Sequence, residues 1–241
     1  MVAPMPPRSS APPTAPPPAG EPLWVAFLNT GPAPGADGGP DVLRNFDHFV
    51  AWLVATAALD AERGPSIRRR AEQQPAGAAA ALVDARRVRA ALRGLAEPGH
   101  ASASAGAAGR GRARAEADAL AEINRVLGRS AGMRRVERGA HGRYTRTFVT
   151  VGDAFAGLLV PVADSAAETL VTGGVSRVRS CADPRCGRAF VDTTRNGRRR
   201  WCDMATCGNR AKAARHRRRQ AAPAAGQAGV GASLRYPIST A

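Results

Sequence analysis

Apolar residues recur at helical spacing in four stretches of the chain, and each stretch predicts an amphipathic helix. The first helix is expected from about Val42 or Phe46 to Leu59, and the second over residues 77–96. The third is expected over 114–128, and the fourth from Asp153 to Val171 with a kink or a restart at Pro161. The inward-facing positions are Phe46, Phe49, Val50, Leu53 and Ala57; Leu82, Ala85, Val88, Leu92 and Leu95; Leu120, Ile123 and Leu127; and Phe155, Leu158, Leu159, Val162, Ala166 and Leu170.

Glycine and proline mark where these helices end. Gly64-Pro65 is expected to end the first helix, and residues 98–112, rich in Gly, Ala and Ser, read as a linker. Gly173-Gly174 is expected to end the fourth helix and to act as a hinge. Arg86, Arg89 and Arg93 lie opposite the apolar stripe of the second helix, so we expect them on a solvated face.

Two stretches predict strands rather than helices. The apolar run over residues 23–29 reads as a buried strand. Residues 133–137 and 143–150 alternate as in a hairpin whose turn, at 139–142, contains an exposed His141. We therefore expect residues 22–172 to form an α+β domain that is mostly helical, with a short strand and a hairpin.

The two ends of the chain lack the periodicity of a folded element. Residues 1–21 contain eight prolines and no apolar segment like that of a signal peptide, so we expect a disordered arm. Residues 221–241 read as a disordered Ala/Gly tail. The apolar stretch from Phe49 to Leu59 is eleven residues long, too short to span a bilayer. We expect a soluble cytoplasmic protein with no membrane partner.

All four cysteines lie close together near the C-terminus, as two C-x4-C pairs separated by fifteen residues. Thiolates are strong ligands of zinc, which prefers four of them in a tetrahedron. Cys181, Cys186, Cys202 and Cys207 are therefore expected to hold one zinc ion, which is structural because four thiolates leave no open position. The alternative of two disulfides needs an oxidising compartment, and nothing in the sequence indicates export.

Positive charge is concentrated in the same segment. Residues 176–220 contain fourteen Arg or Lys and three Asp, a net charge of +11 out of +16 for the whole chain. Arginine is frequent everywhere in this sequence, so the total charge alone is weak evidence. The clustering is stronger evidence, because such density is stabilised by a polyanion, and nucleic acid is the obvious one.

The segment 176–220 also has the signals of a small zinc-binding fold. Asn196-Gly197 predicts a hairpin turn between a strand through Phe190 and a second strand that ends at Trp201. Phe190 and Trp201 are expected to cover the zinc site, and the chain is expected to become helical after Cys202, to about Arg219. This order describes a treble-clef-like finger, with a zinc ribbon as the alternative.

The sequence Cys207-Gly208-Asn209-Arg210, within the stretch from Cys181 to Arg219, resembles the signature of the CGNR zinc fingers. In that family the finger follows an alanine-rich ABATE domain, and residues 22–172 resemble this domain at Phe27-Leu28-Asn29-Thr30, Trp52-Leu53 and Pro161-Val162-Ala163. Such proteins are regarded as stress-induced transcription regulators of bacteria. The resemblance implies a bacterial DNA-binding regulator located at the nucleoid.

We expect the arginines and the lysine of the finger to contact nucleic acid. Arg210 and Arg215 are our choice for base edges, because arginine pairs well with guanine. The remaining expected contacts are Arg195, Arg198, Arg199, Arg200, Lys212, Arg217, Arg218 and Arg219.

Other functions remain as alternatives. The finger could bind structured RNA, its thiolates could act as a redox switch, or the N-terminal domain could be an enzyme or ligand-binding domain that the finger only tethers. No HExxH, GxSxG or phosphate-binding glycine loop occurs, so we expect no enzyme activity. The helical domain is expected to sense a small-molecule ligand or to mediate assembly, for example as a homodimer. A deep pocket with convergent polar groups in residues 22–172 would favour sensing or catalysis over a scaffold.

Overall fold

The computed structural model describes residues 20–32, 41–96, 107–138, 144–151 and 155–221. Several expectations fall outside these ranges: most of the N-terminal arm and of the C-terminal tail, most of the 98–112 linker, the hairpin turn with His141, and the helix start at Asp153. None of the described helices is long and apolar enough to cross a membrane.

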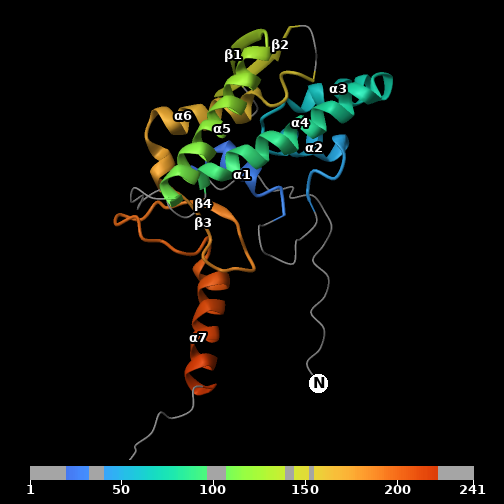
Figure 1. The fold of residues 1–241 in the computed structure, drawn as a ribbon. Coiled ribbons are helices and arrows are strands. Elements are labelled where there is room, and N and C mark those ends of the chain that lie inside the picture. The colour runs from blue at the N-terminus through green and yellow to red at the C-terminus, as the bar shows by residue number, and fades with distance from the viewer. Residues whose placement is uncertain (1–19, 33–40, 97–106, 139–143, 152–154, 222–241) are drawn as a thin grey trace, which may run out of the picture.

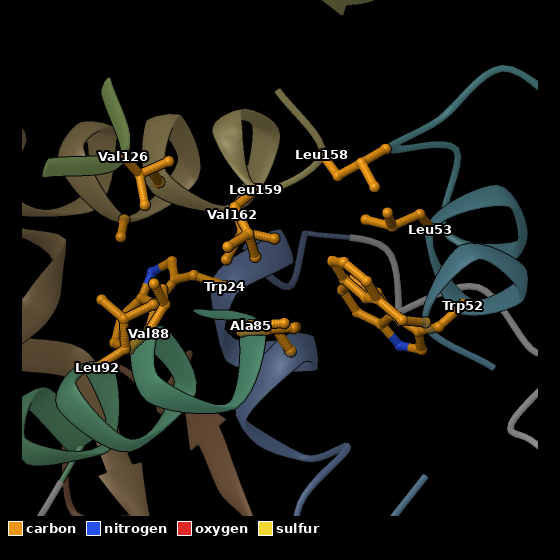
Figure 2. Packing of buried hydrophobic residues seen from close by; sticks show 14 of the residues in the cluster. Trp24, Trp52, Leu53, Ala85, Val88, Leu92, Val126, Leu158, Leu159 and Val162 are labelled. Atoms are coloured by element: carbon orange, nitrogen blue, oxygen red, sulfur yellow. The ribbon is translucent and has the colours of Figure 1, made fainter. Parts of the chain in front are cut away.

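Helix α1 (Leu23–Leu28) packs between α4 (Pro75–Arg93) and α6 (Val160–Val171), as Figure 1 shows. The helices α2 (Phe46–Ala55), α3 (Gly64–Gln73) and α5 (Ala107–Arg129) complete this helical part. One hydrophobic cluster joins all six helices. Figure 2 shows the Trp24 indole on the side of α4 that carries Val88 and Leu92.

The prediction of a strand over residues 23–29 is wrong, because this segment forms α1. Trp24, Val25, Phe27 and Leu28 are all fully buried. A short segment that is buried on every side has no polar face, so its pattern does not distinguish a helix from a buried strand. The segment is fixed by contacts with α6, where the Trp24 Nε1 donates to the Thr169 hydroxyl at 2.9 Å.

Helix α2 has the inner face expected from its sequence but ends earlier. Phe46, Phe49, Val50 and Leu53 are buried as predicted, whereas Ala57 lies beyond the helix and is exposed. Gly64-Pro65 does not end this helix. It begins α3, directly after the 3₁₀ turn η1 (Ala61–Arg63). Proline fits the first turn of a helix because the N–H that it lacks would have no helical partner there.

Ala57 closes α2 in the left-handed region, with φ of 55°. The Ala58 N–H donates to the Leu53 carbonyl (2.8 Å) and the Ala57 N–H to the Val54 carbonyl (3.0 Å), which is the Schellman pattern of a helix end. Glycine adopts this conformation without strain, so Ala57→Gly should raise the free energy of unfolding by about 0.5–1 kcal/mol in urea denaturation.

A matched control is Ala80→Gly, at an exposed position inside α4. There the same change should lower the free energy of unfolding by about 1 kcal/mol, because glycine is a poor helix former. If both variants lose stability, the left-handed conformation at Ala57 carries no strain that glycine relieves.

Helix α4 buries Ala85, Val88 and Leu92 as predicted, and the 3₁₀ turn η2 (Gly94–Ala96) that follows buries Leu95. Leu82 packs at the edge of the cluster and is partly exposed. The stripe therefore faces the core over the length expected from the sequence.

Of the three arginines on the opposite face of α4, Arg86 is exposed as expected and Arg93 is half-buried, but Arg89 is not solvated, which corrects the prediction for that residue. Arg89 is buried and donates to the Asp41 carboxylate (2.8 Å for Nη1) and to the Thr30 hydroxyl (3.0 Å). Arg86 and Arg93 each donate to backbone carbonyls. The end of α1 and the chain before α2 cover this face. Both covering segments are distant in sequence from α4, so the local pattern could not show them.

Helix α5 begins at Ala107, inside the expected linker, because alanine and arginine are both good helix formers. Its inner face is centred on Ala119, Ile123 and Val126, whereas Leu120 is 41% exposed and was wrongly assigned to the core. Helix α6 begins at Val160 with Pro161 in its first turn, and residues 155–159 form turns, so the predicted helix starts later than expected and is not interrupted at Pro161.

The expected hairpin is confirmed by strands β1 (Gly132–Arg138) and β2 (Tyr144–Thr150). They pair antiparallel in a register that runs from Gly132↔Thr150 to Arg138↔Tyr144. The fold is thus α+β and mostly helical, with a small four-cysteine finger at its C-terminal end.

The finger begins with the 3₁₀ turn η4 (Gly174–Arg177), since Gly173 ends α6 as predicted, with φ of 72°. Strands β3 (Val178–Ser180) and β4 (Ala189–Val191) pair antiparallel. The π-helical turn η5 (Met204–Gly208) leads into α7 (Asn209–Ala221). Figure 1 shows α7 projecting away from the rest of the molecule.

The predicted strand ending at Trp201 does not form. The C-x4-C turn brings β4 back beside β3, so β4 has its partner before the chain reaches the Asn196-Gly197 turn. That turn is present as expected, with Gly197 at φ of 58°. The chain after it is held by the buried Asp192, which accepts from the Arg199 N–H at 2.8 Å.

The finger is packed against the helical part. The Asn29 side chain makes two hydrogen bonds with the Ala189 backbone, at 2.9 and 3.0 Å. The Ser180 hydroxyl donates to the Ala96 carbonyl at 2.7 Å, and Val178 and Ala189 are buried in the same cluster as the helices. Gly173 therefore separates the two parts along the sequence, but the finger and the helical part are in direct contact in the structure.

Candidate metal centre and basic surface

The four cysteines meet at one point, as the sequence predicted. One comes directly after β3, one from the turn that follows, and two from the chain around η5. Their sulfur atoms all lie within 4.8 Å of one another, with 3.5 Å between Cys186 and Cys202 and 3.8 Å between Cys202 and Cys207. Sulfurs about 2.3 Å from a tetrahedral zinc ion are about 3.8 Å apart. The donor set and its size thus fit one zinc ion, which would have no open position for chemistry.

The Cys-Gly-Asn-Arg sequence builds the second half of this centre. Cys207 supplies a sulfur, and a Cβ at Gly208 would overlap the Met204 side chain. The Asn209 side chain donates to the Ala205 carbonyl at 2.9 Å and closes the π turn onto α7. Cys207 thus belongs to the metal centre, and Asn209 fastens the turn to the helix that follows.

Arg210 connects the two halves of the centre. Its Nη2 donates to the Cys207 sulfur at 3.0 Å, and its Nε lies 2.9 Å from a carboxylate oxygen of the buried Asp183. We expected Arg210 at a base edge, but these contacts are those of a residue that holds the metal centre together. No signal in the sequence paired it with Asp183, which lies in the first C-x4-C turn.

Burial and hydrogen bonds change the acidity of the Cys186, Cys202 and Cys207 thiols. Burial raises the pKa of Cys202 and Cys186 above the usual value of a thiol. Burial acts on Cys207 too, but hydrogen bonds, that from Arg210 foremost, bring the pKa of Cys207 below its usual value. Zinc binds thiolates, so metal binding must release protons from the first two residues.

Two aromatic residues cover the sulfurs as predicted. Phe190 is buried with Cys181 and Cys207, and Trp201 packs against this cluster. The Arg199 guanidinium lies 4.9 Å from the centre of the Phe190 ring and donates to the backbone carbonyls of Trp201 and Cys202. The Arg199 guanidinium is therefore engaged by contacts within the finger and is not available to bind a phosphate.

The other expected contacts with nucleic acid are exposed at two places. Arg195, Arg198 and Arg200 surround the Asn196-Gly197 turn. The rest lie along α7: Lys212, Arg215, Arg217, Arg218 and Arg219. Helix α7 has no acidic residue, and between Lys212 and Gln220 only Ala214 is even partly buried.

A cavity of about 500 Å³ opens in the helical part, beside α6. Its polar lining includes Glu21, Asp164, Glu168 and Arg134, and Arg134 donates to Asp164 at 2.6 Å. Burial raises the pKa of Glu21 above its usual value, opposed by the charges of two arginines of the finger. The cavity thus has both polar and apolar side chains in its lining.

Comparison with known proteins agrees with both parts of the structure. Residues 21–174 match the ABATE family, described as "Putative stress-induced transcription regulator", and residues 177–220 match the CGNR zinc finger. No curated protein matches the sequence. Since the ABATE match alone spans well over half of the 241 residues, the chain belongs to the ABATE family and carries a CGNR zinc finger at its C-terminal end.

Proposed function

We propose that this protein is a bacterial transcription regulator whose zinc finger binds duplex DNA. The observation that carries the proposal is α7, a helix that is exposed on nearly every side and has no acidic residue. A helix that is polar all round lacks the apolar face that normally stabilises helices in proteins. A partner of opposite charge supplies the missing stabilisation.

The positions of the charges within α7 support a polyanionic partner. Lys212, Arg215 and Arg219 are spaced by three and four residues, so they lie on one face of the helix. Like charges at this spacing repel one another and destabilise an isolated helix. Phosphate groups attract these positive side chains and offset the repulsion between them. An α-helix also fits the major groove of B-form DNA.

In this proposal Arg215 approaches a base edge, and Arg217 and Arg218 support the contact with the backbone. Arg210 and Arg199 have a structural role instead, because both are engaged within the finger. RNA is the second candidate partner, since a basic helix also binds phosphate in A-form grooves.

The role we propose for the helical part is sensing rather than catalysis. The cavity beside α6 offers an apolar wall together with carboxylates and one arginine, which suits a small molecule with an apolar body and a polar group. The helix that lines this cavity leads directly through η4 into the finger, so the pocket and the DNA-binding part share one continuous segment.

The proposal is tested by the salt dependence of binding to duplex DNA. With about five to seven phosphate contacts, the slope of log affinity against log salt should be about −4.5 to −6. Replacing Lys212, Arg215 and Arg219 together by alanine should flatten the slope by about two units, because Lys212 and Arg219 contact phosphate whereas Arg215 approaches a base edge. Fluorescence anisotropy with a labelled duplex at several salt concentrations measures the slopes of the wild-type protein and of the variant. The same titration with an RNA hairpin of equal length compares the two candidate partners.

A charge-matched control is the replacement of Arg68, Arg69 and Arg70 by alanine, in α3 of the helical part. It removes the same net charge but should leave the slope unchanged within about half a unit. Equal slopes for the two triple variants would show that only the total charge matters. A wild-type affinity that does not change with salt would contradict DNA binding by this surface.

A further inference from the structure

A second basic surface lies apart from α7, where η4 and β3 meet the Asn196-Gly197 turn. It is an open hollow of about 670 Å³ lined by five arginines: Arg177, Arg179, Arg195, Arg198 and Arg200. None of the described residues that line it is acidic. We call this surface the arginine basin.

The alternation of β3 explains why Arg179 faces the basin. Val178 is buried in the hydrophobic core, so the next residue, Arg179, lies on the opposite face of the strand, while Arg177 lines the basin from the end of η4. From the sequence we singled out only the arginines that follow Asn196-Gly197 and the one before it. The contribution of residues 177 and 179 depends on the folding of β3 against the later turn.

The basin is held in shape by its own arginines. Arg177 donates to the Thr194 carbonyl at 2.9 Å, and Arg179 donates to the Gly197 carbonyl at 2.7 Å. Gly197 lies at φ of 58°, where a larger residue would be strained, and a Cβ there would come within 3.1 Å of the Arg177 Nη1. Arg177 and Arg179 are therefore held in place before any ligand arrives, which reduces the entropy cost of binding at these two residues.

The buried Asp192 carboxylate neutralises only part of the positive charge of the basin. Asp192 is fully buried beneath it, and its carboxylate is already engaged by the Thr194 N–H (3.0 Å) and the Arg199 N–H (2.8 Å). The Arg179 Nε lies 3.4 Å from this carboxylate and is buried without a hydrogen bond within the described residues. Within the described residues, Asp192 pairs with Arg179, and the other four arginines of the basin have no carboxylate partner.

We propose that the arginine basin binds the phosphate groups of a nucleic-acid backbone, so that the finger holds its partner at two places, the basin and α7. Guanidinium forks match phosphate oxygens in pairs, and the open shape suits a continuous chain of phosphodiesters. Arg195 and Arg198 make no hydrogen bond or ion pair within the described residues, so their donors are free for this ligand. The inference rests on the proposed function and adds a second contact surface to it.

The test uses the full zinc-loaded protein with Arg195 and Arg198 both replaced by glutamine. These two side chains do not hold the turn, so the variant should fold normally. The slope of log affinity against log salt on duplex DNA should flatten by about two units, at about 0.9 for each lost contact. Replacing Arg69 and Arg70, both exposed in α3, by glutamine is the charge-matched control and should leave the slope unchanged.

A second measurement locates the anion directly. Inorganic pyrophosphate is titrated into the protein while the arginine Nε–H signals are followed by NMR, with Arg179→Lys used to assign its signal. We expect the Arg179 signal to shift at lower pyrophosphate concentration than any signal from α7. Equal shifts in the basin and in α7 would mean that the basin is ordinary charged surface, and the inference would fail.

The two proposals fail in different ways. If the basin variant binds DNA with the wild-type slope while the α7 variant still loses affinity, the basin inference is wrong and the DNA-binding function stands. If the wild-type protein binds neither DNA nor RNA in a salt-dependent way, the proposed function is wrong, and the assignment of the basin to nucleic acid is wrong with it.

Discussion

A Cys202→Ser variant is expected to lose its zinc ion and, with it, the folded finger. Apart from Phe190 and Trp201, the finger has no large aromatic side chain, so metal binding must supply most of its folding free energy. In zinc-finger peptides this contribution is on the order of 10–16 kcal/mol at neutral pH. Elemental analysis should give one zinc per wild-type chain and none for the variant.

The loss should remain largely within the finger. In the described residues, Val178 and Ala189 are the only buried members of the main cluster that come from beyond residue 172. We therefore expect the helical part to stay cooperatively folded, with a lower melting temperature because the contacts of Asn29 with Ala189 are lost.

A matched control is Ala205→Ser, an exposed position in the same turn, which should keep its zinc. Wild-type protein purified under reducing conditions without zinc would contradict the metal centre. So would a Cys202→Ser finger that keeps its dispersed amide signals in NMR.

Asp41→Ala is expected to lower the free energy of unfolding by about 3 kcal/mol. The change leaves the Arg89 guanidinium buried with only the Thr30 hydroxyl as a side-chain partner. Removing one member of a buried ion pair costs about 3–5 kcal/mol, and the partial exposure of Asp41 places it at the lower end. Urea denaturation of the zinc-loaded protein measures the difference.

Two variants separate the ion pair from general effects of charge. Asp47→Ala removes an exposed carboxylate 4.0 Å from Arg68 and should cost less than about 1 kcal/mol. Combining Asp41→Ala with Arg89→Met should restore part of the lost stability, because no buried charge is left unpaired. If Asp41→Ala and Asp47→Ala are equally mild, Arg89 is solvated in solution and the buried pair does not exist.

The ion pair also predicts how stability depends on pH. Burial would raise the pKa of Asp41, but the hydrogen bond and the charge of Arg89 outweigh it and lower the pKa below its usual value. A lowered pKa in the folded state stabilises the protein above the unfolded-state pKa of about 3.9. This contribution is lost as the pH falls through the pKa of the folded state.

The sequence by itself determined the features that depend on local spacing. Cys181, Cys186, Cys202 and Cys207 lie within one short segment, and the preference of zinc for four thiolates leaves one way to satisfy them. The apolar stripes of α2 and α4, the β1–β2 hairpin and the basic α7 were also readable, because periodicity and turn residues act within a few positions.

Only the tertiary structure decided the features that depend on what covers a segment. The run over 23–29 became a helix because α4 and α6 surround it, and burial on all sides removes the polar face that would have identified it. Arg89 can be buried because Asp41, which lies before α2 in the sequence, neutralises its charge. A side chain's local pattern shows which face it occupies, but the partner on that face comes from elsewhere in the chain.

The same reason applies to the basic residues of the finger. Their sequence indicated positive charge but not which groups were free to meet a ligand. Folding directed Arg210 to Asp183 and Arg199 to the backbone near the zinc site, and it brought Arg177 and Arg179 beside the distant Asn196-Gly197 turn. Charge is a property of each residue, whereas its availability depends on partners that only the folded chain places within reach.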